Sequence, residues 1–167
     1  MKTIDFDFDN VGGISSIYAF PPQDVQSILL QPSKGTAKLT FNEDANIIQL
    51  PVYAPNSTSW SEDHTVGDAG DMYAVAISGF IPRHASSQLV NELSRGKWMV
   101  VHQDANGDIV LSGTTEVPLT FTSGKTTGTD GSTRNGTAFT FAANEPTPSI
   151  LIDPTALSLS YIIMPSP

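Results

Sequence analysis

The sequence predicts a mainly β protein, an antiparallel β-sandwich or a small barrel, with extended loops and one packed α-helix at about residues 86–95. In residues 97–113, two apolar runs rich in Val and Ile flank Asn106-Gly107, and an Asn-Gly pair between such runs is the strongest short-range sign of a β-hairpin. Residues 117–122 alternate apolar and polar side chains, as strands with one buried and one wet face do.

Length and charge restrict the class of protein. A chain of 167 residues is long enough for one domain with a real core. The net charge of -9 argues against a basic nucleic-acid clamp and against binding to anionic membranes. The absence of Cys excludes a disulfide framework and a thiol nucleophile. No apolar run reaches the roughly 18 residues of a membrane span, and we expect no signal peptide and no membrane partner.

The first elements are expected to be strands. Residues 4–9 alternate apolar side chains with Asp, which predicts a strand with an acidic solvent face; the alternative is a row of carboxylates for a cation. Glycines in residues 10–13 predict a turn. Residues 14–20 are predicted to form the return strand, which ends at Pro21 because proline cannot continue a ladder.

The next segments are less uniform. Residues 24–30 have helical spacing but strand length, so both interpretations stay open. Residues 36–41 and 46–53 are expected to pair through the turn-forming residues between them. Pro51 would then place its strand at a sheet edge or a bulge.

A polar stretch at residues 54–71 is expected to be a long loop or a hairpin arm. Trp60 is isolated within it, and it either contacts a partner or folds back onto the core. Residues 72–81 alternate and predict a strand that ends at Pro82.

Residues 85–95 predict the helix, because Leu89 and Leu93 repeat at a spacing of four with Val90 beside them. Its expected terminal residues are Ser86 or Ser87 as N-cap, Arg95 in the last turn and Gly96 just beyond the end. The helix is too short to be stable alone, so it must pack on the sheet.

The remaining chain is expected to form a meander followed by a tail. Strands at 97–103, 109–113, 117–122 and 137–141 would follow one another in the sheet, with a mobile loop or hairpin tip at 122–136. We place the domain at residues 1–145 and a Pro-punctuated C-terminal extension at 146–167. Its apolar segments either close the domain's own sheet or add a strand to a neighbouring copy.

No motif for catalysis, cofactor binding or metal binding is visible, so we predict none of these sites and no enzymatic activity. His64, His84 and His102 are isolated and are expected to be surface or cap residues. Residues 104–108 loosely match a calcium loop but lack its bidentate Glu, so a plain hairpin turn is favoured. A glycan-acting or glycan-binding protein would instead place Trp60 and Trp98 in one cleft, beside carboxylates roughly 5–9 Å apart.

The whole chain resembles small structural proteins of tailed bacteriophages and prophages, of the tail-tube-like kind. The resemblance runs through Trp98, the Asp-x-Asn-Gly turn at 104–107 and the Pro-Leu-x-Phe of 118–121. Further matching segments are 9–14, 68–73, 77–82, 112–114, 127–128 and 134–136, with Phe-x-Phe at 139–141. The Pro-rich tail after Asn144 departs from the pattern.

The resemblance implies a non-enzymatic virion protein, assembled in the host bacterial cytoplasm, that forms rings of the tail tube or the head–tail connector. Its partners would be other copies of itself and neighbouring virion proteins, with no cofactor. DNA would slide through an acidic lumen without sequence-specific binding. The alternatives are a capsid decoration or host-adhesion module and a glycan-binding accessory module.

A ring would require contacts between adjacent copies, and the arm and the tail are the segments that exceed the needs of a compact domain. We therefore expect the arm and the tail to lie on adjacent copies. Deleting residues 146–167 would then leave a folded, soluble monomer that no longer assembles. The candidate inter-subunit contacts are Trp60, Ile150, Leu151, Ile152, Leu159 and Tyr161.

Overall fold

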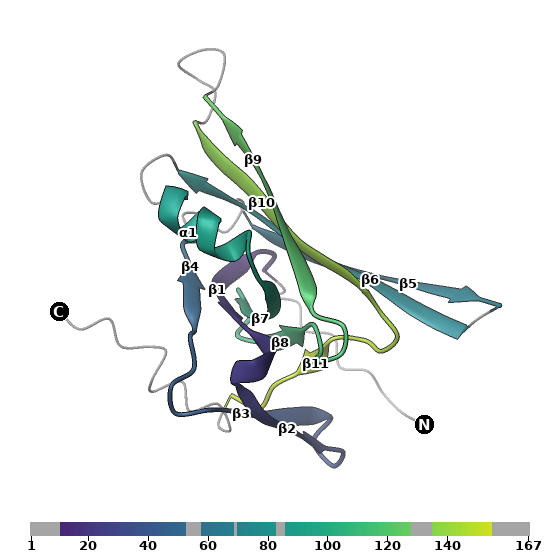
Figure 1. Ribbon diagram of the computed structural model, residues 1–167. Coiled ribbons are helices and arrows are strands. Elements are labelled where there is room, and N and C mark those ends of the chain that lie inside the picture. The colour runs from purple at the N-terminus through teal and green to yellow at the C-terminus, as the bar shows by residue number, and fades with distance from the viewer. Residues whose placement is uncertain (1–10, 53–57, 69, 83–85, 128–134, 155–167) are drawn as a thin grey trace.

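A computed structural model describes residues 11–52, 58–68, 70–82, 86–127 and 135–154. Within these ranges the protein is mainly β, with antiparallel sheets and one α-helix (Figure 1). The predicted fold class is therefore confirmed. The sheets end at free strands in the described part of the chain, so the arrangement is a sandwich and not a closed barrel. The strand predicted at residues 4–9 lies outside the described residues.

One sheet has the order β4–β1–β7–β8–β11. These strands are β4 (Ile48–Leu50), β1 (Ile14–Phe20), β7 (Lys97–Asp104), β8 (Ile109–Ser112) and β11 (Ile150–Leu151). The hairpin predicted around Asn106-Gly107 is confirmed, since Gln103 lies opposite Ile109. Strand β4 pairs with β1 alone and ends before Pro51, as expected for an edge strand.

The second sheet has the order β9–β10–β6–β5. Its strands are β9 (Leu119–Thr126), β10 (Gly136–Glu145), β6 (Gly70–Pro82) and β5 (Ser59–Gly67). Strand β7 joins the two sheets, because Lys97 and Trp98 pair with Thr120 and Leu119 of β9. Of the two alternatives given for each region, the hairpin is thus correct for the described parts of both 54–71 and 122–136.

The predicted meander is wrong in one respect: β9 pairs with β7 and not with β8. Strand β11 pairs with β8 instead. After β8 the chain turns at Gly113, whose φ of +86° favours glycine, and returns beside Trp98. A side chain at Gly113 would also lie 3.2 Å from the Trp98 carbonyl oxygen.

A separate hairpin pairs β2 (Val25–Gln31) with β3 (Thr36–Phe41), after a short 3-10 turn, η1 (Pro22–Asp24). The ambiguous segment 24–30 is therefore a strand. The predicted pairing of residues 36–41 with 46–53 is wrong, because β3 pairs with β2 and β4 pairs with β1. Gly35, with a φ of +69°, provides the tight turn that makes the local pairing possible.

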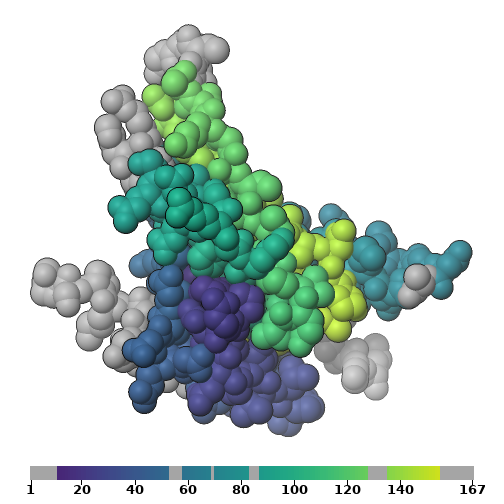
Figure 2. All heavy atoms as spheres, in the orientation of Figure 1, coloured from purple at the N-terminus to yellow at the C-terminus, as the bar shows by residue number. Residues whose placement is uncertain are grey.

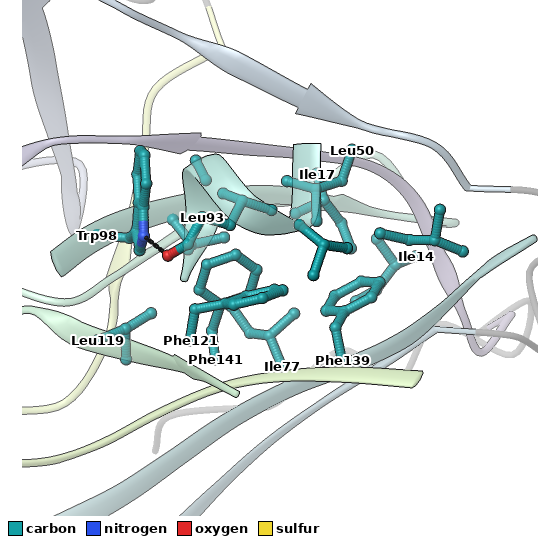
Figure 3. Packing of buried hydrophobic residues seen from close by; sticks show 14 of the residues in the cluster. Ile14, Ile17, Leu50, Ile77, Leu93, Trp98, Leu119, Phe121, Phe139 and Phe141 are labelled. Atoms are coloured by element: carbon teal, nitrogen blue, oxygen red, sulfur yellow. Dashed lines mark hydrogen bonds between the residues drawn. The ribbon is translucent and has the colours of Figure 1, made fainter. Parts of the chain in front are cut away.

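Strand β7 separates two hydrophobic cores. Trp98 and Val100 face the core between the two sheets, whereas Met99 and Val101 face the core beneath the β2–β3 hairpin. A strand buried on both faces reads as a continuous apolar run, which explains why the sequence of β7 does not alternate. The first core is shown in Figure 3, where the rings of Phe121, Phe139 and Phe141 gather below Ile17 and Leu50. Burying each such side chain stabilises the fold by about 1.5–3 kcal/mol.

Helix α1 (Ser86–Leu93) packs Val90 and Leu93 onto the first core, as its apolar stripe predicted. Two details of the C-terminal end were wrong. The helix ends at Leu93, so Arg95 does not lie in its last turn. Gly96 does not adopt the left-handed conformation of a helix-ending glycine. The presence of glycine at this position is explained by the lack of space, since a Cβ at Gly96 would lie 2.8 Å from Cζ2 of Trp98. The predicted N-cap at Ser86 or Ser87 stays a prediction, because the residues just before the helix lie outside the described ranges.

Candidate assembly surfaces and the buried polar cluster

The outer face of the β9–β10–β6–β5 sheet carries small side chains. The register places them in rows across all four strands, because partners in adjacent strands lie side by side. One row is Ser59, Ser78, Thr140 and Thr122, and the next is Ser61, Ala76, Ala142 and Thr120. The Ser78 and Thr140 hydroxyls are 3.2 Å apart. Lys97, which pairs with Thr120, donates a hydrogen bond to its hydroxyl at 2.6 Å.

Both outer strands of this sheet have unpaired edges within the described part of the chain. Strand β5 pairs with β6 alone. Strand β9 pairs with β10 on one side, and on the other only Leu119 and Thr120 pair, with β7. The outer edge of residues 121–125 is therefore open. An unpaired edge presents a row of backbone donors and acceptors to another chain.

The β5–β6 hairpin projects from the body as an arm, which Figures 1 and 2 show at the right. Its end carries Val66, 75 % exposed, and Met72, 49 % exposed. These two side chains lie on opposite faces of the ribbon, since their direct partners are Asp71 and Thr65. The His64 and Tyr73 rings stack on each other nearby, with their centroids 4.6 Å apart. The arm thus offers apolar contacts on both faces.

Most of the described residues that were predicted to contact an adjacent copy pack within their own chain. Trp60 is half-buried, packs on the first core and donates from Nε1 to Ser112 Oγ at 3.2 Å, so the interpretation that it folds back is correct. Ile150 and Ile152 pack on the second core of their own chain. The expectation that this part of the tail lies on an adjacent copy is therefore wrong. Leu151 is exposed. Leu159 and Tyr161 lie outside the described residues.

A buried polar cluster near Trp60 escaped prediction from the sequence. Glu145 is almost fully buried, and its Oε1 accepts a hydrogen bond from the Gly113 backbone N–H at 2.9 Å. Glu62 Oε2 accepts one from the Ser149 N–H at 2.7 Å. Burial, and secondarily the charge of Glu62, raise the pKa of Glu145, while the hydrogen bond from Gly113 opposes this rise.

The alternation of β10 contains a signal for this cluster. Phe139, Phe141 and Glu145 share one strand face, so the pattern that buries the two rings also directs the carboxylate inward. Across β6, Glu62 occupies the same face of β5 as Trp60. The network ties together three strands and the segment before β11, which gives it a structural role.

His102 departs from expectation, because it is 2 % exposed on β7 and not a surface residue. Burial lowers the pKa of His102 to about 4, although nearby Asp104 opposes the shift. The imidazole is therefore neutral at pH 7. His64 is exposed, as predicted, and His84 lies outside the described residues.

The geometry does not match the glycan-cleft arrangement that joins Trp60 and Trp98. Trp98 is buried, and its Nε1 donates to the Leu93 carbonyl. The hairpin-turn interpretation of residues 104–108 is confirmed, since Asp104 Oδ1 accepts the backbone N–H groups of Asn106 and Asp108 at 2.9 and 2.8 Å.

The described ranges contain no group of three or more His, Cys, Asp or Glu side chains able to hold a metal ion. The helix found there is not long and apolar enough to cross a membrane. No protein-family model matches the chain, and neither a curated protein nor a solved structure matches it significantly.

Proposed function

We propose that the chain is a non-enzymatic structural protein of a bacteriophage virion that assembles into rings of a tail tube or a head–tail connector. Copies join head to tail around a central DNA conduit. The supporting observation is that the β9–β10–β6–β5 sheet has an open edge on each side, β5 on one and residues 121–125 on the other. A heterologous contact between these two edges closes into a ring when the rotation between copies permits it.

The outer face of the same sheet suits the wall of a conduit. Its rows consist largely of Ala, Ser and Thr, with Asp63 one step further along β5. Proteins that hold DNA do so through Lys and Arg on the phosphates. Apart from Lys97, whose ammonium group donates a hydrogen bond to Thr120, the face presents mainly small hydroxyl and methyl groups. In a chain with a net charge of -9, such a face would let DNA slide without binding it.

The exposed arm suits contacts between successive rings or with neighbouring virion proteins. Val66 and Met72 present apolar surface on both faces of a two-stranded ribbon. A ribbon of this kind is marginal in water without a covering partner. Burial of the end of the arm by another chain would cover the exposed apolar side chains and stabilise the ribbon.

The experiment is to measure the mass of the purified full-length chain over a range of concentrations and to image it by negative-stain electron microscopy. Rings or short tubes are expected. The double variant Ser61→Lys with Thr122→Lys places like charges on the two edges and should prevent assembly. Combining Ser61→Lys with Thr122→Glu should restore it. The control Gln88→Lys adds a charge to the exposed face of α1 and should have no effect.

A chain that stays monomeric at every concentration and binds a capsid shell would instead be a decoration protein. A chain whose rings persist in the Lys–Lys variant would assemble through surfaces other than these two edges.

A further inference from the structure

Strand β2 exposes two neighbouring leucines, one on each face of its hairpin. Leu29 is 58 % exposed and Leu30 is 68 % exposed. Leu30 lies opposite Ala37, which is buried in the second core, so Leu30 extends from the face of the ribbon that covers this core. Leu29 lies opposite Lys38 and extends from the other face. No other two consecutive residues in the described part of the chain are both large, apolar and exposed.

The outer edge of β2 is also unpaired. Among the described residues, β2 pairs with β3 alone, so its other edge leaves a row of backbone donors and acceptors without strand partners. Native proteins usually protect such an edge with charged side chains, with Pro or with a covering segment. Residues 25–31 contain neither a charged side chain nor Pro. An unprotected edge that also exposes two leucines indicates that another strand covers it.

The sequence contains a segment that is complementary to this edge. Residues 155–164 carry no charge and no Pro, and every second residue from 157 to 163 is Leu, Tyr or Ile. This alternation favours a strand, and residues 157–163 match the 7 residues of β2 in length. A strand added along β2 would place this apolar row beside one exposed leucine. Ile162, on the opposite face of the added strand, would lie on the side of the other leucine.

The place where the described chain ends favours the segment of a second copy. Ile152 forms a parallel bridge with Ala37, and the Asp153 N–H donates to the Ala37 carbonyl at 3.0 Å, so the chain leaves along the edge of β3 that faces away from β2. A strand added to β2 would lie three strand spacings from Ile152, roughly 14 Å. The four residues from Asp153 to Leu157 span at most about 14 Å when fully extended. No length remains for the path around the ribbon, so the chain's own residues 157–163 cannot reach the edge.

We propose that residues 157–163 of one copy add as a strand to the free edge of β2 in the next copy and cover Leu29 and Leu30. Backbone hydrogen bonds would supply affinity, and the alternating side chains would supply specificity. The inference rests on the assembly proposed above and names the surface that receives the tail. This edge belongs to the β2–β3 hairpin, at the bottom of Figure 1, and is distinct from the open edges of β5 and β9. Each copy would therefore be held by two different contacts.

The test is disulfide trapping in the full-length chain, which contains no Cys of its own. One preparation carries Leu29→Cys or Leu30→Cys, and the other carries a single Cys in the tail, moved one position at a time from Leu157→Cys to Ile163→Cys. The two are mixed under reducing conditions, allowed to assemble and then oxidised in air with copper phenanthroline. Covalent dimers on a non-reducing gel are expected. Because adjacent strand residues face opposite sides, Leu29→Cys should react with alternate tail positions and Leu30→Cys with those between them.

The matched control is Gln88→Cys on the exposed face of α1, which should react with no tail position. Combining Leu29→Cys with a reactive tail position in one chain should give covalent multimers. A monomer with an internal link would overturn the proposal, and so would dimers that form equally with Gln88→Cys. Electron microscopy of the same samples under reducing conditions separates this inference from the proposed function. Rings without links to β2 would overturn the inference and keep the ring, whereas links without rings would support the inference and overturn the ring.

Discussion

The indole Nε1 of Trp98 donates a hydrogen bond to the backbone carbonyl of Leu93 at 2.7 Å, the contact drawn in Figure 3. Leu93 is the last residue of α1, where backbone carbonyls have no partner within the helix. The bond therefore closes the helix end and fixes it to β7. The ring lies so close to Gly96 that the connection between the two elements leaves no room for a side chain.

Replacing Gly96 by Ala tests this packing. The new Cβ would lie within 2.9 Å of two atoms of the rigid, buried indole, so the ring or the helix end must move. We expect a loss of about 1–3 kcal/mol in the free energy of unfolding, measured by urea denaturation. Gly124→Ala is the control, since nothing lies within 4 Å of its added methyl, and it should change stability by less than about 0.5 kcal/mol. Equal effects of the two substitutions would contradict the packing argument.

The sequence was sufficient for local structure and insufficient for strand order. The hairpin at Asn106-Gly107, the helix stripe and the alternation of β6 depend on near neighbours, and each was predicted correctly. Strand β4 pairs with β1, and β11 takes the place beside β8 that was predicted for β9. Both of these partners are distant along the chain. Alternation identifies which face of a strand is buried, but it contains no information about which strand lies beside it.

Acid should destabilise the protein through His102. Its pKa is about 4 when folded and 6.5 in the unfolded chain, so the unfolded state binds the proton more strongly. This contribution to stability is fully present above pH 6.5 and is lost as the pH falls toward 4. Between pH 7.5 and 4.5 the wild type should lose roughly 2.5 kcal/mol more than His102→Leu. Urea titrations of both proteins at the two pH values measure this difference. Identical losses of stability in the wild type and in His102→Leu would mean that the imidazole is not buried.

Glu145 should have the opposite pH dependence. Because its pKa is raised in the folded state, protonation favours folding, and the wild type gains stability from this group as the pH falls through the raised value toward 4.5. Glu145→Gln keeps an oxygen acceptor for the Gly113 N–H and removes the charge. The variant should be more stable than the wild type at pH 8. This difference in the free energy of unfolding should decrease as the pH is lowered. Greater stability of the wild type at pH 8 would show that the cluster requires the charge.

Neither ionisable site could be located from residue types alone. Glutamate is rarely buried, and nothing near Glu145 in the sequence supplies a positive partner. Its partner is a backbone N–H at Gly113, thirty-two positions away, which only the tertiary fold brings near. His102 is likewise buried by Trp60, from a different strand.

The tail provides a final test, in two truncations that separate folding from assembly. Deleting residues 146–167 removes Ile152, which is 2 % exposed in the second core, and Asp153, whose carboxylate contacts Lys34 Nζ at 2.7 Å. It also removes the Ser149 N–H that pairs with Glu62. We expect a loss of at least about 3 kcal/mol in the free energy of unfolding, from one buried Ile and two polar contacts. A deletion that melted like the wild type would contradict the packing of residues 150–153.

Deleting only residues 155–167 keeps every one of these contacts and is the matched comparison. This shorter truncation should unfold at the wild-type urea concentration, because the core side chains and β11 remain. If Leu159 and Tyr161 contact an adjacent copy, it should nevertheless stay monomeric under conditions in which the full chain forms rings, as sedimentation velocity would measure. Normal assembly would exclude the two residues as necessary contacts. Loss of stability would instead place the segment in the core of its own chain, as Ile152 already is.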